Sequence, residues 1–100
     1  QEATAILSYG NIRLDRESHT VSVDGKPISL THTEYGLLEL FMLHPGRVFT
    51  RDNLLNKVWG YDFAGEEKTV NIHIMNLRRK LDTDLIETIR GVGYRLGKEN

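Results

Sequence analysis

The chain has 100 residues, no cysteine and a formal net charge of −1. This length predicts one domain with a modest core of its own, and a chain without cysteine forms neither a disulfide framework nor a thiolate metal site. No apolar run approaches the ~20 residues that a membrane-crossing helix needs, and no signal-peptide pattern opens the chain, so we expect a cytoplasmic protein. Because the sequence begins with Gln1 rather than Met, we expect it to be one domain of a longer protein.

Short segments of alternating apolar residues fill the first third of the chain. Residues 6–9, 11–15, 20–24 and 27–30 each predict a short strand, and Asp24-Gly25 is a strong hairpin turn signal. Together they predict a small antiparallel sheet with one solvated face. His19 stands alone at a turn or strand start, where we expect a surface residue rather than a ligand.

A first helix is predicted over residues 32–43. Thr31 and Glu34 form a capping-box pair, S/T-x-x-E, ahead of an apolar run. Apolar side chains cover most of the circumference of this helix. That pattern predicts the central, most buried helix of the core rather than the wall of a ligand pocket.

A second helix is predicted over residues 51–59, after a short strand at 47–49. Thr50 supplies its N-cap, and Gly60 is a plausible residue to end it. Trp59 lies at the end of this helix. It is either an ordinary core tryptophan or a contact for a phosphate oxygen through its indole N–H.

The segment 68–81 predicts a third helix with two different faces. Its inner stripe follows helical spacing and consists of Val70, Ile74, Leu77 and Leu81. The opposite face carries Lys68, Ile72, Met75, Asn76 and Arg79. The flanks carry Thr69, Asn71, His73, Arg78 and Lys80.

The outer face of this helix has an unusual chemistry for a structural helix. Its charged residues are all basic, and an amide, a branched aliphatic and a thioether lie at its centre. Cations that contact phosphates, placed around short side chains that contact base edges, are typical of a helix in a DNA major groove. The segment is therefore predicted to be a recognition helix.

The net charge of the chain conceals an uneven distribution. Residues 1–67 hold six Lys/Arg against ten Asp/Glu, a net −4, whereas residues 68–98 hold seven against three, a net +4. The chain is thus predicted to be a dipole whose positive end contains the recognition helix.

A loop precedes this helix and a hairpin follows it. In the loop, Glu66 and Glu67 suit the positive end of the helix dipole, which we prefer to a metal site because the four histidines never reach ligand spacing. Residues 86–90 and 94–96 predict two strands around a glycine turn. Arg90 and Arg95 flank the tip, and Arg90 is predicted to contact nucleic acid.

Three helices, the third of them basic, followed by a hairpin, give the order of a winged helix-turn-helix. The chain also resembles the C-terminal DNA-binding effector domains of OmpR/PhoB-type two-component response regulators. The resemblance covers nearly the whole chain, in a fixed order of motifs: LTHTEY from Leu30, HPGRVFTR from His44, Val58-Trp59-Gly60, Thr69-Val70-Asn71, LRRKL from Leu77 and TIRGVGYR from Thr88.

This resemblance implies an α+β fold, a winged helix-turn-helix with an N-terminal four-stranded antiparallel sheet, three helices and a C-terminal β-hairpin wing. It implies a transcription regulator with a receiver domain upstream that is phosphorylated on an Asp. Members bind direct repeats of double-stranded DNA as head-to-tail pairs, with the third helix in the major groove and the wing near the minor groove. The loop before that helix contacts RNA polymerase in some members, which here points to Tyr61, Asp62, Phe63 and Glu66.

The resemblance also assigns DNA contacts by position. Phosphate contacts fall on Trp59, Lys68 and Thr69. Base-edge contacts fall on Asn71, Ile72, Met75 and Asn76. Backbone or base contacts fall on Arg78 and Arg79, and wing contacts on Thr88 and Arg90.

Two departures from the family matter. Lys68 is often Arg there, so a bidentate fork is lost while the charge is kept. Met75 and Asn76 occupy positions that carry arginines in the best-known member, so the target sequence of that member is not transferred to this chain.

Two other classes of function are compared with the residues. A winged-helix module for protein interaction would use exposed Ile72 and Met75 as an apolar docking patch. An enzyme is excluded because the sequence lacks a cysteine nucleophile, a G-x-S-x-G elbow, a phosphate-binding glycine loop and paired carboxylates near histidine. No cofactor and no metal ion are expected.

Overall fold

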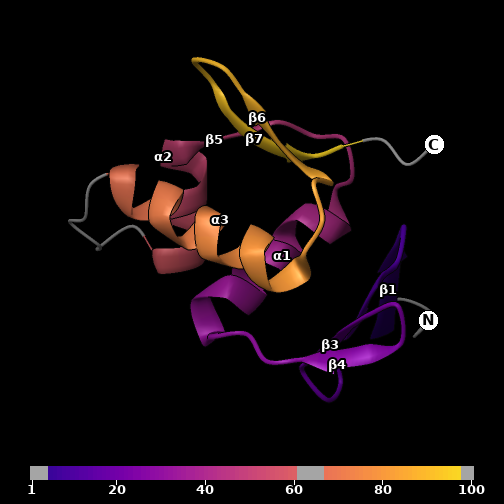
Figure 1. Ribbon diagram of the computed structural model, residues 1–100. Coiled ribbons are helices and arrows are strands. Elements are labelled where there is room, and N and C mark those ends of the chain that lie inside the picture. The colour runs from indigo at the N-terminus through magenta and orange to yellow at the C-terminus, as the bar shows by residue number, and fades with distance from the viewer. Residues whose placement is uncertain (1–4, 61–66, 98–100) are drawn as a thin grey trace.

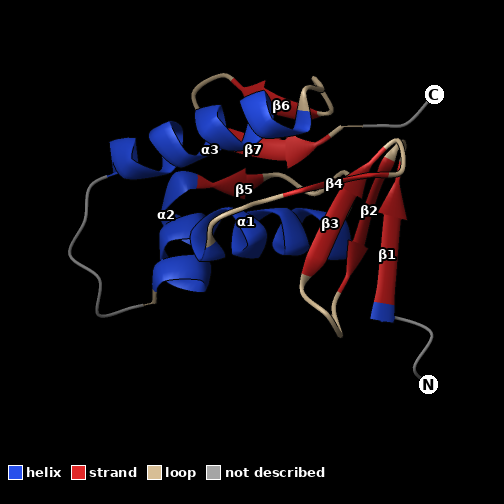
Figure 2. Ribbon diagram, turned by 60° about the horizontal axis from the view of Figure 1, so that its bottom comes forward, coloured by secondary structure: helices blue, strands red, loops and turns tan. Residues whose placement is uncertain are grey.

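A computed structural model of the protein describes residues 5–60 and 67–97. Within these residues, an N-terminal sheet packs on one side of the helices and a second, smaller sheet lies on the other (Figures 1 and 2). The N-terminal sheet has the antiparallel order β1-β2-β3-β4. Its strands are β1 (Ile6–Tyr9), β2 (Ile12–Asp15), β3 (Thr20–Val23) and β4 (Lys26–Ile28).

The turn between β3 and β4 fixes where β4 begins. Asp24 and Gly25 both have positive φ, 54° and 81°, and Val23 pairs with Lys26 across them. This is the two-residue turn that suits the twist of a hairpin. It starts β4 at Lys26, one residue earlier than predicted, and residues 29–30 leave the sheet before the first helix.

Helix α1 (His32–Leu43) begins at the predicted capping box. Thr31 Oγ1 accepts a hydrogen bond from Glu34 N at 3.2 Å, and Glu34 Oε1 accepts one from Thr31 N at 3.0 Å. The helix lies between the two sheets and contacts α3 (Glu67–Leu81), β1 and β7 (Gly93–Leu96). The prediction of a central, buried helix is confirmed by its buried side chains, Glu34, Tyr35, Leu37, Leu38, Phe41 and Met42.

The second helix has the predicted bounds but changes its winding. Thr50 caps α2 (Arg51–Leu54) by accepting from Asn53 N at 3.0 Å. The chain continues as a π-helical turn, η2 (Leu55–Trp59), and Gly60 N donates to Leu55 O, five residues back, at 3.0 Å. The helix predicted over residues 51–59 is therefore confirmed, with its second half wound as a π-helix. Gly60 ends the element as predicted, with a φ of +103°.

The second sheet contains the wing and one additional strand. Strands β6 (Ile86–Ile89) and β7 form the predicted hairpin, and β5 (Phe49–Thr50) pairs with the other edge of β7. The strand predicted at 47–49 is thus displaced toward Thr50, because Phe49 pairs with Tyr94 and Thr50 with Gly93. A Cβ atom at Gly93 would overlap the Phe49 carbonyl oxygen, so only glycine permits this close approach.

The fold class predicted from the sequence is confirmed by these elements. The described residues form a four-stranded sheet, three helical segments and a C-terminal hairpin wing. None of the helices described is long and apolar enough to span a bilayer.

A buried carboxylate joins the start of α1 to the end of α3. Lys80 Nζ donates to Glu34 Oε1 at 2.7 Å, and the Glu34 side chain is only 3% exposed. Burial by itself raises the pKa of Glu34, but the hydrogen bonds from Lys80 and from the Thr31 backbone outweigh burial and leave this pKa below its ordinary value. The stabilisation by ionised Glu34 is therefore present at neutral pH and is lost as the pH falls through the folded-state pKa.

Replacing Lys80 with Met should expose the cost of burying this carboxylate. We expect the free energy of unfolding at pH 7 to fall by about 1–2 kcal/mol, at the low end for a buried pair because the Lys80 side chain is 39% exposed. Urea unfolding of the variant and the parent, at pH 7 and at acidic pH, measures this difference in the free energy of unfolding. The deficit should narrow in acid, where Glu34 becomes protonated. The control is Lys26→Met on exposed β4, and a deficit independent of pH would contradict the interpretation.

Candidate nucleic-acid interface

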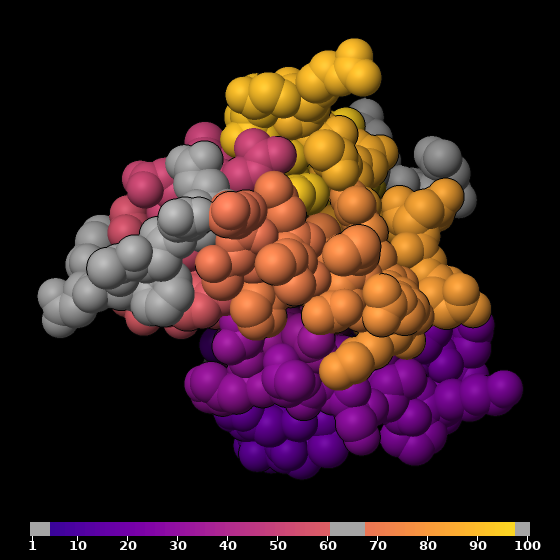
Figure 3. Space-filling model, turned by 60° about the vertical axis from the view of Figure 1, so that its left-hand side comes forward, coloured from indigo at the N-terminus to yellow at the C-terminus, as the bar shows by residue number. Residues whose placement is uncertain are grey.

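Helix α3 buries one stripe and exposes the other, as its spacing predicts. Val70, Ile74, Leu77 and Leu81 are at most 1% exposed. On the opposite face, Ile72 is 52% and Met75 53% exposed. Figure 3 shows α3 in orange across the middle of one face of the molecule, with the yellow wing beside it.

Cations surround the apolar centre of this face. Lys68 and Arg79 are exposed, and Asn76 is half-buried between them along the helix. Lys80, at the end of the helix, is bonded to Glu34. The exposed surface of α3 thus combines positive charge, an amide and two apolar side chains, a set that suits phosphates, base edges and thymine methyl groups.

Trp59 and His73 meet at the beginning of this surface. Their rings are edge to face with centroids 5.2 Å apart, and His73 Nδ1 lies 2.8 Å from Thr69 O. Trp59 packs against the core and is half-buried, which supports the core interpretation of this residue. Its contact with a phosphate, and that of half-buried Thr69, stay predictions.

Asn71 lies at the junction of three elements rather than on the open face. Its Oδ1 accepts hydrogen bonds from Arg51 Nε at 2.8 Å and from Tyr94 Oη at 2.5 Å. These bonds join α2, α3 and β7. The predicted contact of Asn71 with a base would have to come from its amide nitrogen, because its oxygen is already engaged.

Arg78 is also engaged within the protein. Its Nε donates to Ile86 O at 3.0 Å and its Nη2 donates to Thr88 Oγ1 at 2.7 Å. The structure therefore brings together Arg78 and Thr88, two residues for which the sequence predicted separate DNA contacts.

The wing projects Arg90 at its tip. Arg90 is exposed, and the turn closes through Val92 N, which donates to Ile89 O at 2.9 Å, while Gly91 has a φ of +76°. Arg95 lies further along β7, where it forms an ion pair with Glu87 at 2.8 Å. Of the two arginines that flank the tip, Arg90 is thus the exposed one, and Arg95 is half-buried and paired.

Sequence reasoning missed Arg51 and Tyr94 as members of this region. The Arg51 guanidinium carbon lies 5.4 Å from the centre of the Tyr94 ring, and both residues bond to Asn71. These residues are 20 or more positions apart in the chain. Spacing along the sequence therefore carries no signal for their contact.

Two other predictions from the sequence concern an RNA polymerase contact and a metal site. Tyr61, Asp62, Phe63 and Glu66, the predicted contacts for RNA polymerase, lie outside the described residues. Within residues 5–60 and 67–97, no three His, Asp or Glu side chains are grouped as a metal site would require.

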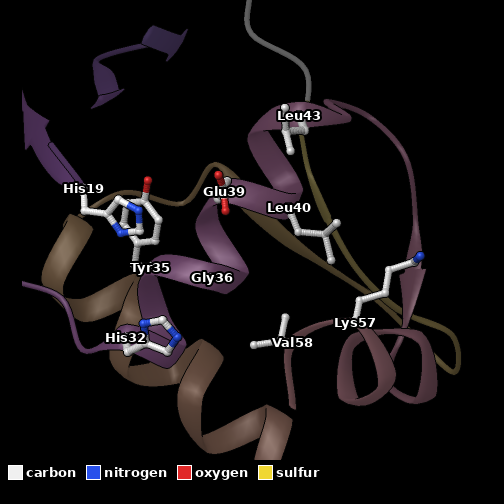
Figure 4. A pocket seen from close by; sticks show the side chains of 9 residues that line it. All are labelled: His19, His32, Tyr35, Gly36, Glu39, Leu40, Leu43, Lys57 and Val58. Carbon is white, nitrogen blue, oxygen red and sulfur yellow. The ribbon is translucent and has the colours of Figure 1, made fainter. Parts of the chain in front are cut away.

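A pocket of about 220 Å³ lies between α1 and η2 (Figure 4). At the edge of this pocket, the His19 ring stacks on the Tyr35 ring, and the two ring centroids are 4.5 Å apart. Burial, and secondarily Glu39, raises the pKa of Tyr35. His19 is exposed, as predicted for a surface residue, and the lining includes neither the recognition face nor the wing.

Comparison with known proteins agrees with this geometry. Residues 25–96 match the family of C-terminal domains of transcriptional regulatory proteins. The chain is 45% identical over 101 residues to the alkaline phosphatase synthesis transcriptional regulatory protein SphR of Synechococcus elongatus, covering 96% of this chain and 39% of SphR. It is 42% identical over 102 residues to the phosphate regulon transcriptional regulatory protein PhoB of Pseudomonas aeruginosa, covering 99% of this chain and 44% of PhoB.

A solved structure extends the comparison to a DNA complex. The DNA-binding domain of the response regulator AdeR, in complex with an intercistronic region, superposes with a TM-score of 0.84 and 34% identity. The match covers 92% of this chain and 99% of the AdeR domain, whereas the chain spans less than half the length of SphR and PhoB. The chain therefore belongs to the family of C-terminal DNA-binding domains of OmpR/PhoB-type response regulators.

Proposed function

We propose that this domain binds double-stranded DNA in a sequence-specific manner and regulates transcription as the output domain of a two-component response regulator. The observation that carries the proposal is the exposed face of α3, where Ile72, Met75 and Asn76 lie among cations beside an Arg-tipped wing. A helix of this kind fits the major groove, and a neighbouring hairpin reaches the adjacent backbone or minor groove. The family regulates transcription and is not a class of enzymes.

Each side chain has a role in this proposal. Lys68, Thr69 and Trp59 contact phosphates near the beginning of α3, and Arg79 contacts the backbone or a base near its end. Ile72 and Met75 contact thymine methyl groups, and Asn76 bonds to adenine. Arg90 approaches a phosphate or a narrow minor groove, where the negative potential is enhanced.

The proposed assembly extends beyond this chain. The chain spans 39% of SphR and 44% of PhoB, which leaves room in proteins of that length for a receiver domain upstream of this one. Two copies would bind tandem direct repeats head to tail, the acidic first part of one near the basic part of the next, in the bacterial cytoplasm. Tyr61, Asp62, Phe63 and Glu66 would contact RNA polymerase.

A protein-interaction module is the weaker alternative. It would need Ile72 and Met75 to form a continuous apolar patch, yet Lys68 and Arg79 lie exposed on the same face. Affinity for DNA that falls steeply with salt distinguishes DNA binding from salt-insensitive binding of a protein partner.

Selection of bound fragments from a random DNA pool tests the function directly. We expect direct repeats with half-sites about one helical turn apart, roughly 10–11 bp, and sedimentation of a monomer without DNA. Inverted repeats or a stable free dimer would contradict the head-to-tail assembly. Binding that does not depend on salt or sequence would contradict the function itself.

Asn76→Ala should change which sequence is preferred. Loss of the adenine contact is expected to cost ~1–3 kcal/mol on the best site and to relax preference at one A·T pair. Lys68→Ala is the matched comparison and should weaken all sequences alike, because phosphates carry no sequence information. Selection with each variant measures both effects. If the Asn76→Ala consensus equals that of the parent, Asn76 does not contact a base edge.

Arg90→Ala should weaken binding without destabilising the fold. Arg90 is exposed at the tip, so the melting temperature should be unchanged, while the slope of log affinity against log salt should fall by about one unit if a phosphate contact is lost. Titrations at several salt concentrations measure this, with Arg13→Ala, whose side chain is exposed on β2, as the control. Parental affinity at physiological salt would show that the wing tip does not touch DNA.

A further inference from the structure

Arg78 is a residue of α3 whose donors are directed into the wing. Its Nε and Nη2, which share one edge of the guanidinium, reach Ile86 O at 3.0 Å and Thr88 Oγ1 at 2.7 Å. Both acceptors belong to β6, and the Arg78 side chain is half-buried. One planar group thus spans two positions of the same strand, a fork geometry that arginine provides and lysine does not.

The same guanidinium also lies over an aromatic ring of the other wing strand. The Arg78 guanidinium carbon is 5.5 Å from the centre of the Tyr94 ring, and that of Arg51 is 5.4 Å from it, both within the range of cation–π attraction. Tyr94 is 5% exposed. In the part of the chain that the structure describes, no carboxylate forms an ion pair with either arginine.

Asn71 completes the link to the helices. Its Oδ1 accepts from Arg51 Nε and from Tyr94 Oη, so a continuous set of contacts runs from α2 through α3 to both wing strands. We name this set the wing clamp, and it consists of Arg51, Asn71, Arg78, Thr88 and Tyr94.

The clamp and the β-sheet hold the wing from different sides. Strand β5 pairs only with β7, at Phe49–Tyr94 and Thr50–Gly93, and β6 is the outer strand of that sheet. Within the described residues, the side-chain hydrogen bonds from α3 to β6 both come from Arg78. Arg78 is therefore the side chain through which α3 holds the outer wing strand by directional hydrogen bonds, in addition to the apolar packing of Ile86.

We propose that Arg78 is a positioning residue that fixes the wing relative to the recognition helix and acts on DNA through Arg90 rather than through a phosphate or base contact of its own. The inference rests on the proposed DNA binding. Its consequence is that the major-groove and wing contacts are energetically coupled, because a wing released from α3 must be ordered again when DNA binds.

Arg78→Lys separates positioning from direct contact, because it keeps the charge and removes the fork. If Arg78 positions the wing, this variant should lose affinity by about the same factor as Arg90→Ala. The double variant should bind no more weakly than Arg90→Ala alone, since the second change removes a contact that is already lost. Hydrogen exchange of the β6 amides in the free domain should be faster than in the parent.

Two further variants complete the design. Arg13→Lys, at an exposed side chain of β2, is the charge-conserving control. Thr88→Val removes one acceptor and leaves Arg78 in place, so it should also speed hydrogen exchange of the β6 amides. If circular dichroism shows that Arg78→Lys does not fold, Thr88→Val takes its place in the test. Parental affinity of Arg78→Lys, losses that add to those of Arg90→Ala, or parental exchange rates in β6 would overturn the proposal. If the parent itself does not bind DNA, the proposed function fails, while the exchange measurement still tests the clamp.

Discussion

Burial of one stripe of α3 is the constraint on which the rest of the molecule depends. Val70, Ile74, Leu77 and Leu81 are almost completely removed from water, each worth roughly 1.5–3 kcal/mol as an upper estimate. With these side chains fixed, helical geometry leaves no freedom in the direction of the opposite face. The same packing that stabilises the domain therefore also orients the surface proposed to bind DNA.

Polar contacts fix the register between neighbouring elements, which apolar packing alone leaves adjustable. The Glu34 carboxylate is both the second half of the α1 capping box and the acceptor for Lys80, so one group holds the beginning of α1 and the end of α3. Arg16 and Glu39, with Nε and Oε2 3.1 Å apart, join the β2–β3 connection to α1 in a similar way. Apolar contacts are non-directional, whereas these hydrogen bonds specify the register between elements.

The surface chemistry agrees with the uneven charge of the chain. A net charge of −1 gives little reason to expect affinity for a polyanion, yet the basic residues are concentrated after residue 67. Among them, Arg78, Lys80 and Arg95 are used within the protein, on β6, on Glu34 and on Glu87. Lys68, Arg79 and Arg90 are exposed on the recognition face and the wing tip.

The sequence by itself determined the elements and the two faces of α3. Helical periodicity, the Thr31–Glu34 capping box and the Asp24-Gly25 turn are local patterns, and local backbone and side-chain chemistry is sufficient to express them. The sequence also indicated the family, because its motifs follow one another in the order that the family has. The tertiary structure alone decided the π-helical turn, the pairing of β5 with β7, and the engagement of Asn71 and Arg78. The β5–β7 pairing and the bonds of Asn71 join residues 20 or more positions apart that meet only after folding. The π-helical turn and the bonds of Arg78 involve closer neighbours, but the packing of the wing and of α2 against α3 selects them, and helical or strand spacing does not encode that packing.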